Sequence, residues 1–267
     1  MNHERQTTKV RTVFLSDVHL GFRGCNAAAV LDFLRSVECE QIYLVGDIVD
    51  LESLQRSHFW PAPHQQVLDL LFDKARGGTR VIYVPGNHDA ELRVLCNSRL
   101  GNIEIVRDCV HVTADGRRLW VTHGDEFDSK VDCPAWLTGL GNVLYDFILM
   151  LDRHCNAWRR ARGLPYFALA SRLKGLFRTA NRYIAGYESA VAQRTQALGL
   201  DGVVCGHIHR PRIATLNGVL YCNDGDWVES CSALVEAADG RLSLIAAEQE
   251  RAPNKLTRPL PDCSPIN

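Results

Sequence analysis

Five short apolar runs in this chain end in the same way, with a small or polar residue and then aspartate, asparagine or histidine. Such runs of β-branched and aliphatic residues predict buried strands. In an open α/β sheet the carboxyl ends of the strands are where ligands bind, so we expect these polar side chains to gather. The runs span 11–16, 41–45, 80–84, 119–122 and 202–205, and the residues after them are Asp17, His19, Asp47, Asn87, His88, His123, His207 and His209.

The segments between these runs indicate an α/β fold with a largely parallel sheet. Apolar residues recur at helical spacing in 26–37 and 64–74, which predicts an amphipathic helix in each segment. Strands and helices therefore alternate along the first part of the chain, as they do around parallel sheets. Asp-Gly and Asn-Gly pairs at 115–116, 217–218 and 239–240 predict three hairpins.

The composition is that of a globular protein with a sizeable core. Of the 267 residues, 46% are hydrophobic, and the formal net charge of -1 argues against a nucleic-acid partner. The 10 cysteines form no Cys-x-x-Cys pair, so we expect reduced, packed thiols and a cytoplasmic protein. No apolar run has the length of a membrane span. We predict one domain over residues 1–250 and a disordered, proline-containing tail over 251–267.

The side chains at the five strand ends are of the kind that bind divalent cations. Any one of them alone would be interpreted as a cap or a solvated surface group. Carboxylate, amide and imidazole ligands without thiolates suit Mn²⁺, Fe, Zn²⁺ or Mg²⁺. Seven of these eight side chains as ligands would exceed the needs of one four-coordinate ion, so we expect two divalent ions, with Mn²⁺ as our first choice.

Taken together, the motifs resemble those of the calcineurin-like metallophosphoesterases. They are Asp17-x-His19, Gly46-Asp47-x-x-Asp50, Gly86-Asn87-His88-Asp89, His123-Gly124 and Gly206-His207-x-His209. The resemblance implies a four-layer α/β sandwich, in which two mixed sheets are flanked by helices, and a centre with two metals. It implies that Asp17, His19 and His209 hold the first ion, that Asn87, His123 and His207 hold the second, and that Asp47 bridges them.

The same resemblance implies a reaction mechanism. A hydroxide activated by the metals would attack phosphorus in line with the leaving oxygen. His88 would protonate that leaving oxygen or steady the charged phosphorane oxygens. Asp89 would stand behind His88 and fix its tautomer. We therefore expect His88 and Asp89 to be the catalytic residues beside the metals.

The segment 133–200 is predicted to be an insertion of two long helices around a break at 163–165, and it forms the helical cap of the predicted domain. No acidic residue occurs between Arg153 and Tyr187, whereas eight basic residues do. A basic segment with aromatic residues suits an anionic amphiphile or an anionic membrane surface. A helical hairpin that packs its apolar stripe on the sheet and solvates its arginines explains the pattern equally well.

Within the superfamily, the layout resembles the UDP-2,3-diacylglucosamine diphosphatases of lipid A synthesis and a sister branch of that group. The resemblance implies hydrolysis to UMP and an acylated glucosamine 1-phosphate at the inner face of the cell membrane. The partner would then be an anionic nucleotide-linked or lipid-linked phosphate, with peripheral membrane contact. Asn87, His88, Asp128, Lys174, Arg178 and His207 are the expected substrate contacts.

One position departs from that group and keeps other functions open. The established diphosphatases carry arginine where this chain has His88, and histidine is the residue of general phosphodiesterases at this place. Another nucleotide-linked or lipid-linked phosphoester is therefore an alternative substrate. A binding scaffold without catalysis is an alternative of a different class. The complete set of expected metal ligands argues against it, because such scaffolds have lost metal ligands. The sequence leaves the native metal and the oligomeric state open.

Overall fold

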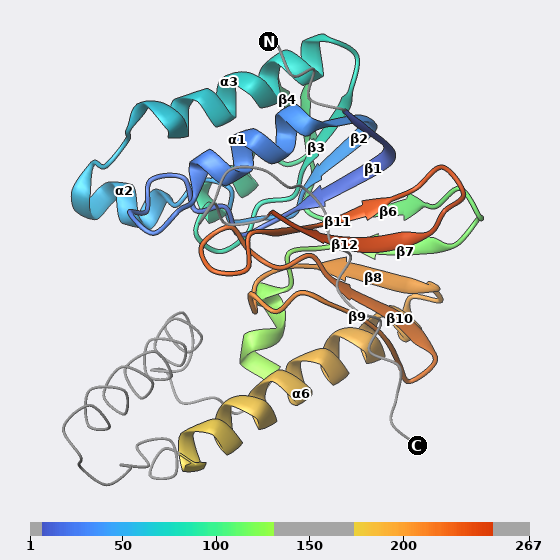
Figure 1. The fold of residues 1–267 in the computed structure, drawn as a ribbon. Coiled ribbons are helices and arrows are strands. Elements are labelled where there is room, and N and C mark those ends of the chain that lie inside the picture. The colour runs from blue at the N-terminus through green and yellow to red at the C-terminus, as the bar shows by residue number, and fades with distance from the viewer. Residues whose placement is uncertain (1–6, 131–173, 248–267) are drawn as a thin grey trace, which may run out of the picture. The chain divides into compact units, whose positions relative to one another are not determined.

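The computed structural model describes residues 7–130 and 174–247, with side chains over 7–128 and 181–247 (Figure 1). The chain divides into two compact units, one made of Met1–Asp125 with Ala192–Asn267 and the other of Glu126–Val191. Most of the predicted insertion 133–200 and the predicted tail 251–267 lie outside the described residues. The division into one domain with an insertion stays a prediction.

The first unit contains a seven-stranded mixed sheet in the order β12-β11-β1-β2-β3-β5-β4. The pairs β1–β2, β2–β3 and β3–β5 are parallel. The pairs β1–β11, β11–β12 and β4–β5 are antiparallel. The parallel arrangement predicted for the first half of the chain is therefore confirmed. The strands are β1 (Thr8–Leu15), β2 (Val37–Leu44), β3 (Arg80–Tyr83), β4 (Ser98–Leu100), β5 (Ile103–Ile105), β11 (Ser232–Glu236) and β12 (Leu242–Ala246).

The second sheet of this unit has five strands in the order β6-β7-β8-β10-β9. Its central strands β7, β8 and β10 are parallel, and β6 and β9 join antiparallel at the two edges. All three hairpins expected from the Gly-containing pairs form, namely β6–β7, β9–β10 and β11–β12. The strands are β6 (Cys109–Val112), β7 (Arg118–Val121), β8 (Gly202–Cys205), β9 (Arg212–Leu216) and β10 (Val219–Asn223).

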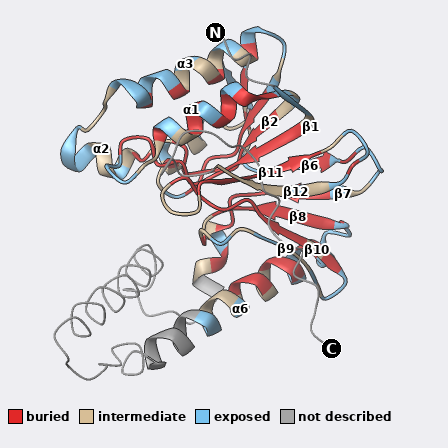
Figure 2. Ribbon diagram, in the orientation of Figure 1, coloured by how far each residue is buried: buried red, intermediate tan, exposed pale blue. Residues whose placement is uncertain are grey.

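The two sheets pack face to face, and helices α1 and α3 cover the outer face of the larger sheet (Figure 1). Alternation along β1 shows how one strand serves both layers, because successive side chains point to opposite faces. Val13 and Leu15 pack toward the helices, whereas Phe14 packs between the sheets. Figure 2 shows the resulting buried strands and the helices with one exposed side. The α/β class with two mixed sheets is as expected.

The helices begin and end where local chemistry favours it. The Asn26 side chain accepts a hydrogen bond from the backbone N–H of Ala29 and so caps α1. Asp50 caps α2 in the same way through Ser53. The α2 helix is absent from the sequence prediction, and β2 begins four residues earlier than predicted, directly after α1. The helices are α1 (Ala27–Ser36), α2 (Leu51–Ser57), α3 (Ala62–Arg76), α6 (Lys174–Ala197) and the 3₁₀ helices η1 (Ala90–Leu95) and η2 (Asp125–Lys130).

A buried charged network joins the two sheets of this unit. The fully buried Glu236 carboxylate on β11 accepts hydrogen bonds from Arg11, Thr12 and the backbone of Ala114. His111 on β6 lies 2.8 Å from it through Nε2. A buried carboxylate is tolerated because these donors replace its hydration. The histidine of the second sheet is thus a structural partner of Glu236.

The contribution of His111 and Glu236 to stability is expected to be lost as the pH is lowered. Burial lowers the pKa of His111 below its ordinary value of 6.5, so the unfolded chain takes up its proton first. Burial alone would raise the pKa of Glu236, but hydrogen bonds from Ala114, Thr12 and His111 lower it below its ordinary 4.5. Both groups therefore stabilise the fold above their unfolded pKa values and lose that contribution below them.

The measurement is the free energy of urea unfolding between pH 8 and pH 5, for the wild type and for His111→Gln. We expect the slope of stability against pH in His111→Gln to differ from that of the wild type, with less stability lost toward pH 5, because the proton uptake of one unfolded imidazole is gone. His58→Gln, at an exposed position, is the control and should keep the slope of the wild type. Equal slopes in His111→Gln and the wild type would contradict the assignment.

Candidate metal centre

The residues expected to bind metal lie at the carboxyl ends of five strands. Strands β1, β2 and β3 of the larger sheet run parallel to one another, as do β7 and β8 of the smaller sheet, so these ends open on the same edge of each sheet. The two edges meet across the interface between the sheets. The ends carry Asp17 and His19, Asp47, Asn87 and His88, His123, and His207 and His209.

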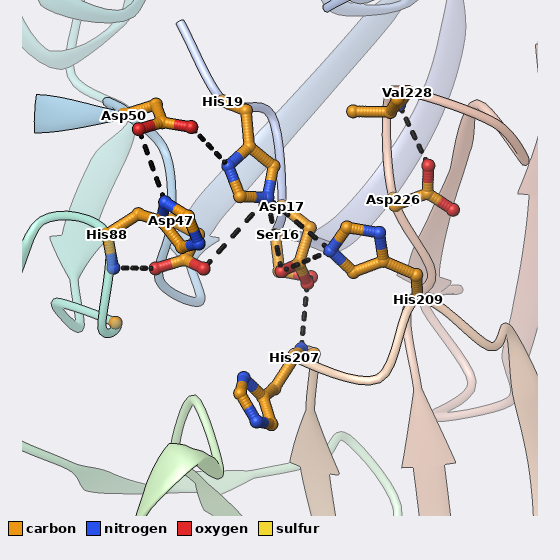
Figure 3. Close-up of polar contacts among 12 residues, drawn as sticks. Ser16, Asp17, His19, Asp47, Asp50, His88, His207, His209, Asp226 and Val228 are labelled. Atoms are coloured by element: carbon orange, nitrogen blue, oxygen red, sulfur yellow. Dashed lines mark hydrogen bonds and ion pairs between the residues drawn. The ribbon is translucent and has the colours of Figure 1, made fainter. Parts of the chain in front are cut away.

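Asp17, His19 and His209 form the first part of the cluster (Figure 3). The Asp17 Oδ1 atom lies 3.1 Å from Nε2 of His209 and 3.8 Å from Nε2 of His19. The two imidazole Nε2 atoms are 3.4 Å apart. One carboxylate oxygen and two ring nitrogens therefore face a common point, which is the arrangement expected of three ligands to one ion.

Asp47 connects this group to the second part of the cluster. Its Oδ2 atom lies 3.4 Å from Nε2 of His123 and 3.9 Å from Nε2 of His19. The Asn87 side-chain oxygen is 3.1 Å from the same nitrogen of His123. The His207 ring packs edge-on against the His123 ring, with 5.2 Å between their centroids. Asp47 thus lies between the two expected sets, where a bridging carboxylate is needed.

The outer ring nitrogens of two histidines are already engaged, which orients their inner nitrogens. His123 donates through Nδ1 to the carbonyl of Val45, 2.8 Å away. His19 Nδ1 lies 3.2 Å from Asp50 Oδ2. Histidines that bind metal usually hold their second nitrogen in this way, which fixes the tautomer. In addition, the buried Oδ1 of Asp17 accepts no hydrogen bond from any described residue. The donor set therefore fits divalent cations.

The buried carboxylates shape the electrostatics of the cluster. Burial alone would lower the pKa of His123 and His209. The nearby charge of Asp47 instead raises the pKa of His123 well above its ordinary range. The charge of Asp17 raises the pKa of His209 to about 9. Burial alone would raise the pKa of Asp17, but the same imidazoles, led by His209, lower it instead. Two ionised carboxylates enclosed by protein attract positive charge, whether a proton or a metal ion.

Most of the expected ligands have an unusual backbone. A positive φ angle is uncommon for residues other than glycine and costs about 1–3 kcal/mol at each position. Long-range hydrogen bonds hold the conformation, including those from the N–H of Asp17 to Gly46 and from the N–H of His19 to Asp47. The residues with this conformation are Asp17 (50°), His19 (54°), Asp47 (53°), His207 (69°) and His209 (51°).

Three glycines make room for the cluster. A Cβ atom at Gly46 would lie 2.3 Å from the His123 ring, and one at Gly86 would lie 2.3 Å from Asp47 Oδ1. A Cβ atom at Gly206 would lie 2.4 Å from Asp17 Oδ2. These distances leave no space for any side chain, because the neighbours are the expected ligands themselves. The glycine in three of the sequence motifs is therefore a packing requirement of the site.

The expectation that Asp89 stands behind His88 is wrong in this structure. The Asp89 carboxylate accepts hydrogen bonds from the backbone of Gly86 and Ile48 and from the hydroxyl of Tyr83, and so fixes the loop. The group beside His88 is Asp50, whose Oδ1 lies 3.2 Å from Nδ1 of the imidazole. The preceding turn folds the Asp89 side chain back under the loop, away from its neighbour in sequence.

Asp50 thus faces two imidazoles of the site, since its other oxygen contacts His19. Burial alone would raise the pKa of Asp50, but hydrogen bonds with His19 and His88 lower it well below its usual range. The sequence analysis included Asp50 in the Gly46-Asp47-x-x-Asp50 motif but gave it no role. Its position directly before an apolar helical turn was the available signal, because aspartate caps helices.

The variant Asp50→Asn is expected to lower metal affinity or activity about 10- to 100-fold, the usual cost of removing a carboxylate that orients metal-binding histidines. The amide keeps the shape and can still cap α2 through its oxygen, so folding should be preserved. Metal titration and steady-state rates measure the effect, and Asp69→Asn, on the surface of α3, is the control. Wild-type metal affinity together with wild-type kcat would contradict the orienting role.

The expected substrate contacts are only partly described. Asp128 lies in the second unit and accepts a hydrogen bond from Tyr183 of α6. Lys174 and Arg178 belong to the first turns of α6, where side chains lie outside the described part of the chain. The helix itself agrees with the helix predicted there. Their contact with a substrate stays a prediction.

The chain is similar to known proteins over most of its length. The model of a family described as Calcineurin-like phosphoesterase matches residues 10–211. The UDP-2,3-diacylglucosamine hydrolase of Xanthomonas campestris pv. campestris is 27% identical over 255 residues, which cover 89% of this chain and 98% of that protein. The enzyme of the same name from Ralstonia nicotianae is 26% identical over 263 residues, covering 86% and 90%. The phosphoesterase Yfce from E. coli, a solved structure, is 18% identical with a TM-score of 0.39, covering 89% and 99%.

Proposed function

The chain belongs to the calcineurin-like phosphoesterase family, and from that premise we propose that it hydrolyses UDP-2,3-diacylglucosamine to UMP and 2,3-diacylglucosamine 1-phosphate. The two relatives with that activity in their names match it over at least 86% of its length and at least 90% of their own. Similarity of this extent supports the same class of substrate, a nucleotide joined to an acylated sugar through a diphosphate.

The observation that carries the proposal is the cluster of carboxylates and imidazoles. The ligand atoms of Asp17, His19 and His209 lie within 4.8 Å of one another, and so do those of Asp17, Asp47 and His123. In our proposal the first three bind one ion, Asn87, His123 and His207 bind a second, and Asp47 binds both. We propose Mn²⁺ as the metal. When bound, two such ions lower the pKa of water and balance the charge that develops on the phosphate oxygens.

His88 is the proposed catalytic side chain beside the metals. Burial alone would lower its pKa, but Asp50 and the charge of Asp47 raise it above the ordinary 6.5. Asp50 lies at Nδ1 of the imidazole, so Nε2 is the atom left to give a proton to the leaving oxygen. The backbone N–H of His88 donates to Asp47 Oδ1 over 2.8 Å. This hydrogen bond holds the loop that carries His88 against the proposed bridging ligand.

His88 also favours a second candidate function. Its imidazole stands where the diphosphatases that the motifs resemble carry arginine, and general phosphodiesterases use histidine there. A simpler phosphodiester, linked to another nucleotide or lipid, is therefore the alternative substrate.

Association with the inner face of the membrane is part of the proposal. None of the helices within residues 7–130 and 174–247 has the length and apolar character needed to cross a bilayer. Contact would instead be peripheral and would come from the basic insertion, as expected for an enzyme whose substrate carries two acyl chains.

The test is incubation of the purified protein with Mn²⁺ and UDP-2,3-diacylglucosamine, with chromatographic detection of UMP. We expect UMP in stoichiometric amounts with the acylated sugar phosphate, and no UMP from the ligand-deficient variant His209→Ala. Turnover of bis(p-nitrophenyl) phosphate without release of UMP would favour the general phosphodiesterase. A protein that binds no Mn²⁺ and turns over neither substrate would be a binding scaffold, and the proposed function would be wrong.

A further inference from the structure

The hydroxyl of Ser16 lies among three oxygen atoms at the edge of the metal cluster. Its Oγ is 2.5 Å from Oδ2 of Asp17, 2.6 Å from Oδ1 of Asp224 and 3.1 Å from the carbonyl oxygen of Gly225. Ser16 and both carboxyl groups are buried. A serine hydroxyl carries a single proton, so it can donate fully to only one of these oxygens.

The count of protons identifies the state of Asp224. Asp17 faces the ring nitrogens of His209 and His19 through Oδ1, and its Oδ2 already accepts from the backbone N–H of His207, so Asp17 is the group that accepts the proton of Ser16. The 2.6 Å approach between Ser16 and Asp224 then needs a second proton, which only the Asp224 carboxyl can supply. The other oxygen of Asp224 is buried and has no hydrogen-bond partner among the described residues. A charged carboxylate in that position would be costly, and burial raises the pKa of Asp224 well above its ordinary value.

The hydrogen bond from Ser16 determines which oxygen of Asp17 is left for a cation. Oδ2 accepts from Ser16 and also from the backbone N–H of His207, 2.9 Å away. Oδ1 accepts no hydrogen bond from the described residues and faces His209 and His19. With both donors in place, Oδ2 of Asp17 is occupied, and Oδ1 is the oxygen that faces the other two expected ligands of the first ion.

The segment 223–230 holds Asp224 in place and shares backbone contacts with two loops of the cluster. Asn223 donates through its side chain to the carbonyl of Gly206, next to His207. Trp227 donates through its backbone N–H to the carbonyl of Asp17. Asp226 accepts from the backbone of Val228 and closes the turn. A shift of this segment would therefore move both ligand loops.

From this arrangement we propose that Asp224 is a positioning residue that acts as a neutral carboxylic acid. It donates to Ser16, which donates to Oδ2 of Asp17, so that Asp17 binds its metal through Oδ1 alone. The five motifs of the sequence analysis do not include Asp224, and this inference gives the stretch 223–229 a physical role. It rests on the metal-binding half of the proposed function and does not depend on the substrate.

The first test is Mn²⁺ affinity measured by isothermal titration calorimetry for Ser16→Ala. Without the hydroxyl, Oδ2 loses a donor and the carboxylate can rotate, so we expect affinity to fall about 10- to 100-fold. Ser36→Ala is the matched control, since Ser36 is another buried serine, and its hydroxyl donates to the carbonyl of Phe33 within α1. It should bind Mn²⁺ like the wild type. Unchanged affinity in Ser16→Ala would overturn the proposal.

The second test uses Asp224→Asn, which keeps the shape and can still donate to Ser16 through its amide. If Asp224 is neutral, the substitution leaves the charge of the site unchanged. Mn²⁺ affinity should then stay within about tenfold of the wild type. This loss is smaller than the usual loss of metal affinity when an orienting group is removed. Infrared spectroscopy at neutral pH should show the carbonyl band of a protonated carboxyl group in the wild type and not in Asp224→Asn. This readout does not depend on activity or on metal.

The outcomes separate this inference from the proposed function. Absence of the carboxyl band in the wild type, or a large loss of Mn²⁺ affinity in Asp224→Asn, would show an ionised Asp224 and overturn the inference. A protein that passes both tests but releases no UMP would overturn the proposed substrate and leave the inference standing. A wild type without any Mn²⁺ binding would overturn both.

Discussion

Replacing Asp47 with asparagine is expected to remove most of the bound metal and to lower hydrolysis at least about a thousandfold. Metal ions contribute several kcal/mol to such reactions, and each 1.36 kcal/mol is a factor of ten in rate. The oxygen of the amide can still accept from the backbone of His88, as Oδ1 does now. Its nitrogen, however, would present N–H groups to His123 and His19, where Oδ2 now lies. A donor at that position repels a cation.

The measurement is metal content by mass spectrometry after dialysis, together with kcat for the best substrate. Asp73→Asn is the control, because Asp73 is an exposed carboxylate on α3. The variant should unfold at a denaturant concentration close to that of the metal-free wild type, which shows that the fold is intact. Full metal occupancy in Asp47→Asn would contradict the position of Asp47 between two ions.

Replacing His88 with alanine is expected to separate chemistry from metal binding. General acid catalysis contributes about 10²- to 10⁴-fold, so kcat should fall by that amount. Metal content should stay at the wild-type level, because His88 is not among the seven proposed ligands. The His88 ring is still close to them, with its centroid 4.7 Å from that of His19, so the metal measurement is essential.

The control for His88→Ala is His58→Ala, which removes an exposed imidazole at the end of α2. It should change neither rate nor metal content. Loss of metal in His88→Ala would assign the residue to the ligands, and full activity would remove it from the reaction. Rescue of the rate by added imidazole would support proton transfer by the missing ring.

The convergence of the ligands could be predicted from the sequence because two local patterns coincide. An apolar run predicts where a strand ends, and a polar residue directly after it predicts what stands at the edge of the sheet. Asp17, Asp47 and His123 follow this rule, and the structure brings them together. Within each sheet the pattern needs no knowledge of long-range contacts, since parallel strands align their carboxyl ends, whereas the packing of one sheet on the other is a long-range contact that the pattern does not contain.

The backbone of the ligands could not be predicted in this way. A left-handed conformation at Asp17 or His209 is unfavourable for the residue itself and is held by partners distant in sequence. The same limit explains the mistake at Asp89, where adjacency to His88 suggested a contact that the turn prevents. Asp50 takes that place because α2 begins there, and α2 is a helix of seven residues with too short an apolar pattern to be recognised.

Because Asp17 and His123 sit on different sheets, neither half of the first unit contains a complete site. Chain collapse and strand pairing within one sheet would leave the ligands dispersed, and they meet only when the sheets dock. If the sheets dock after the folding transition state, the complete metal site forms after it as well. Bound Mn²⁺ should then slow unfolding and leave the refolding rate nearly unchanged. Cation binding would then prolong the life of the folded state without hastening its formation, so the kinetic stability of the protein would depend on the supply of divalent cation.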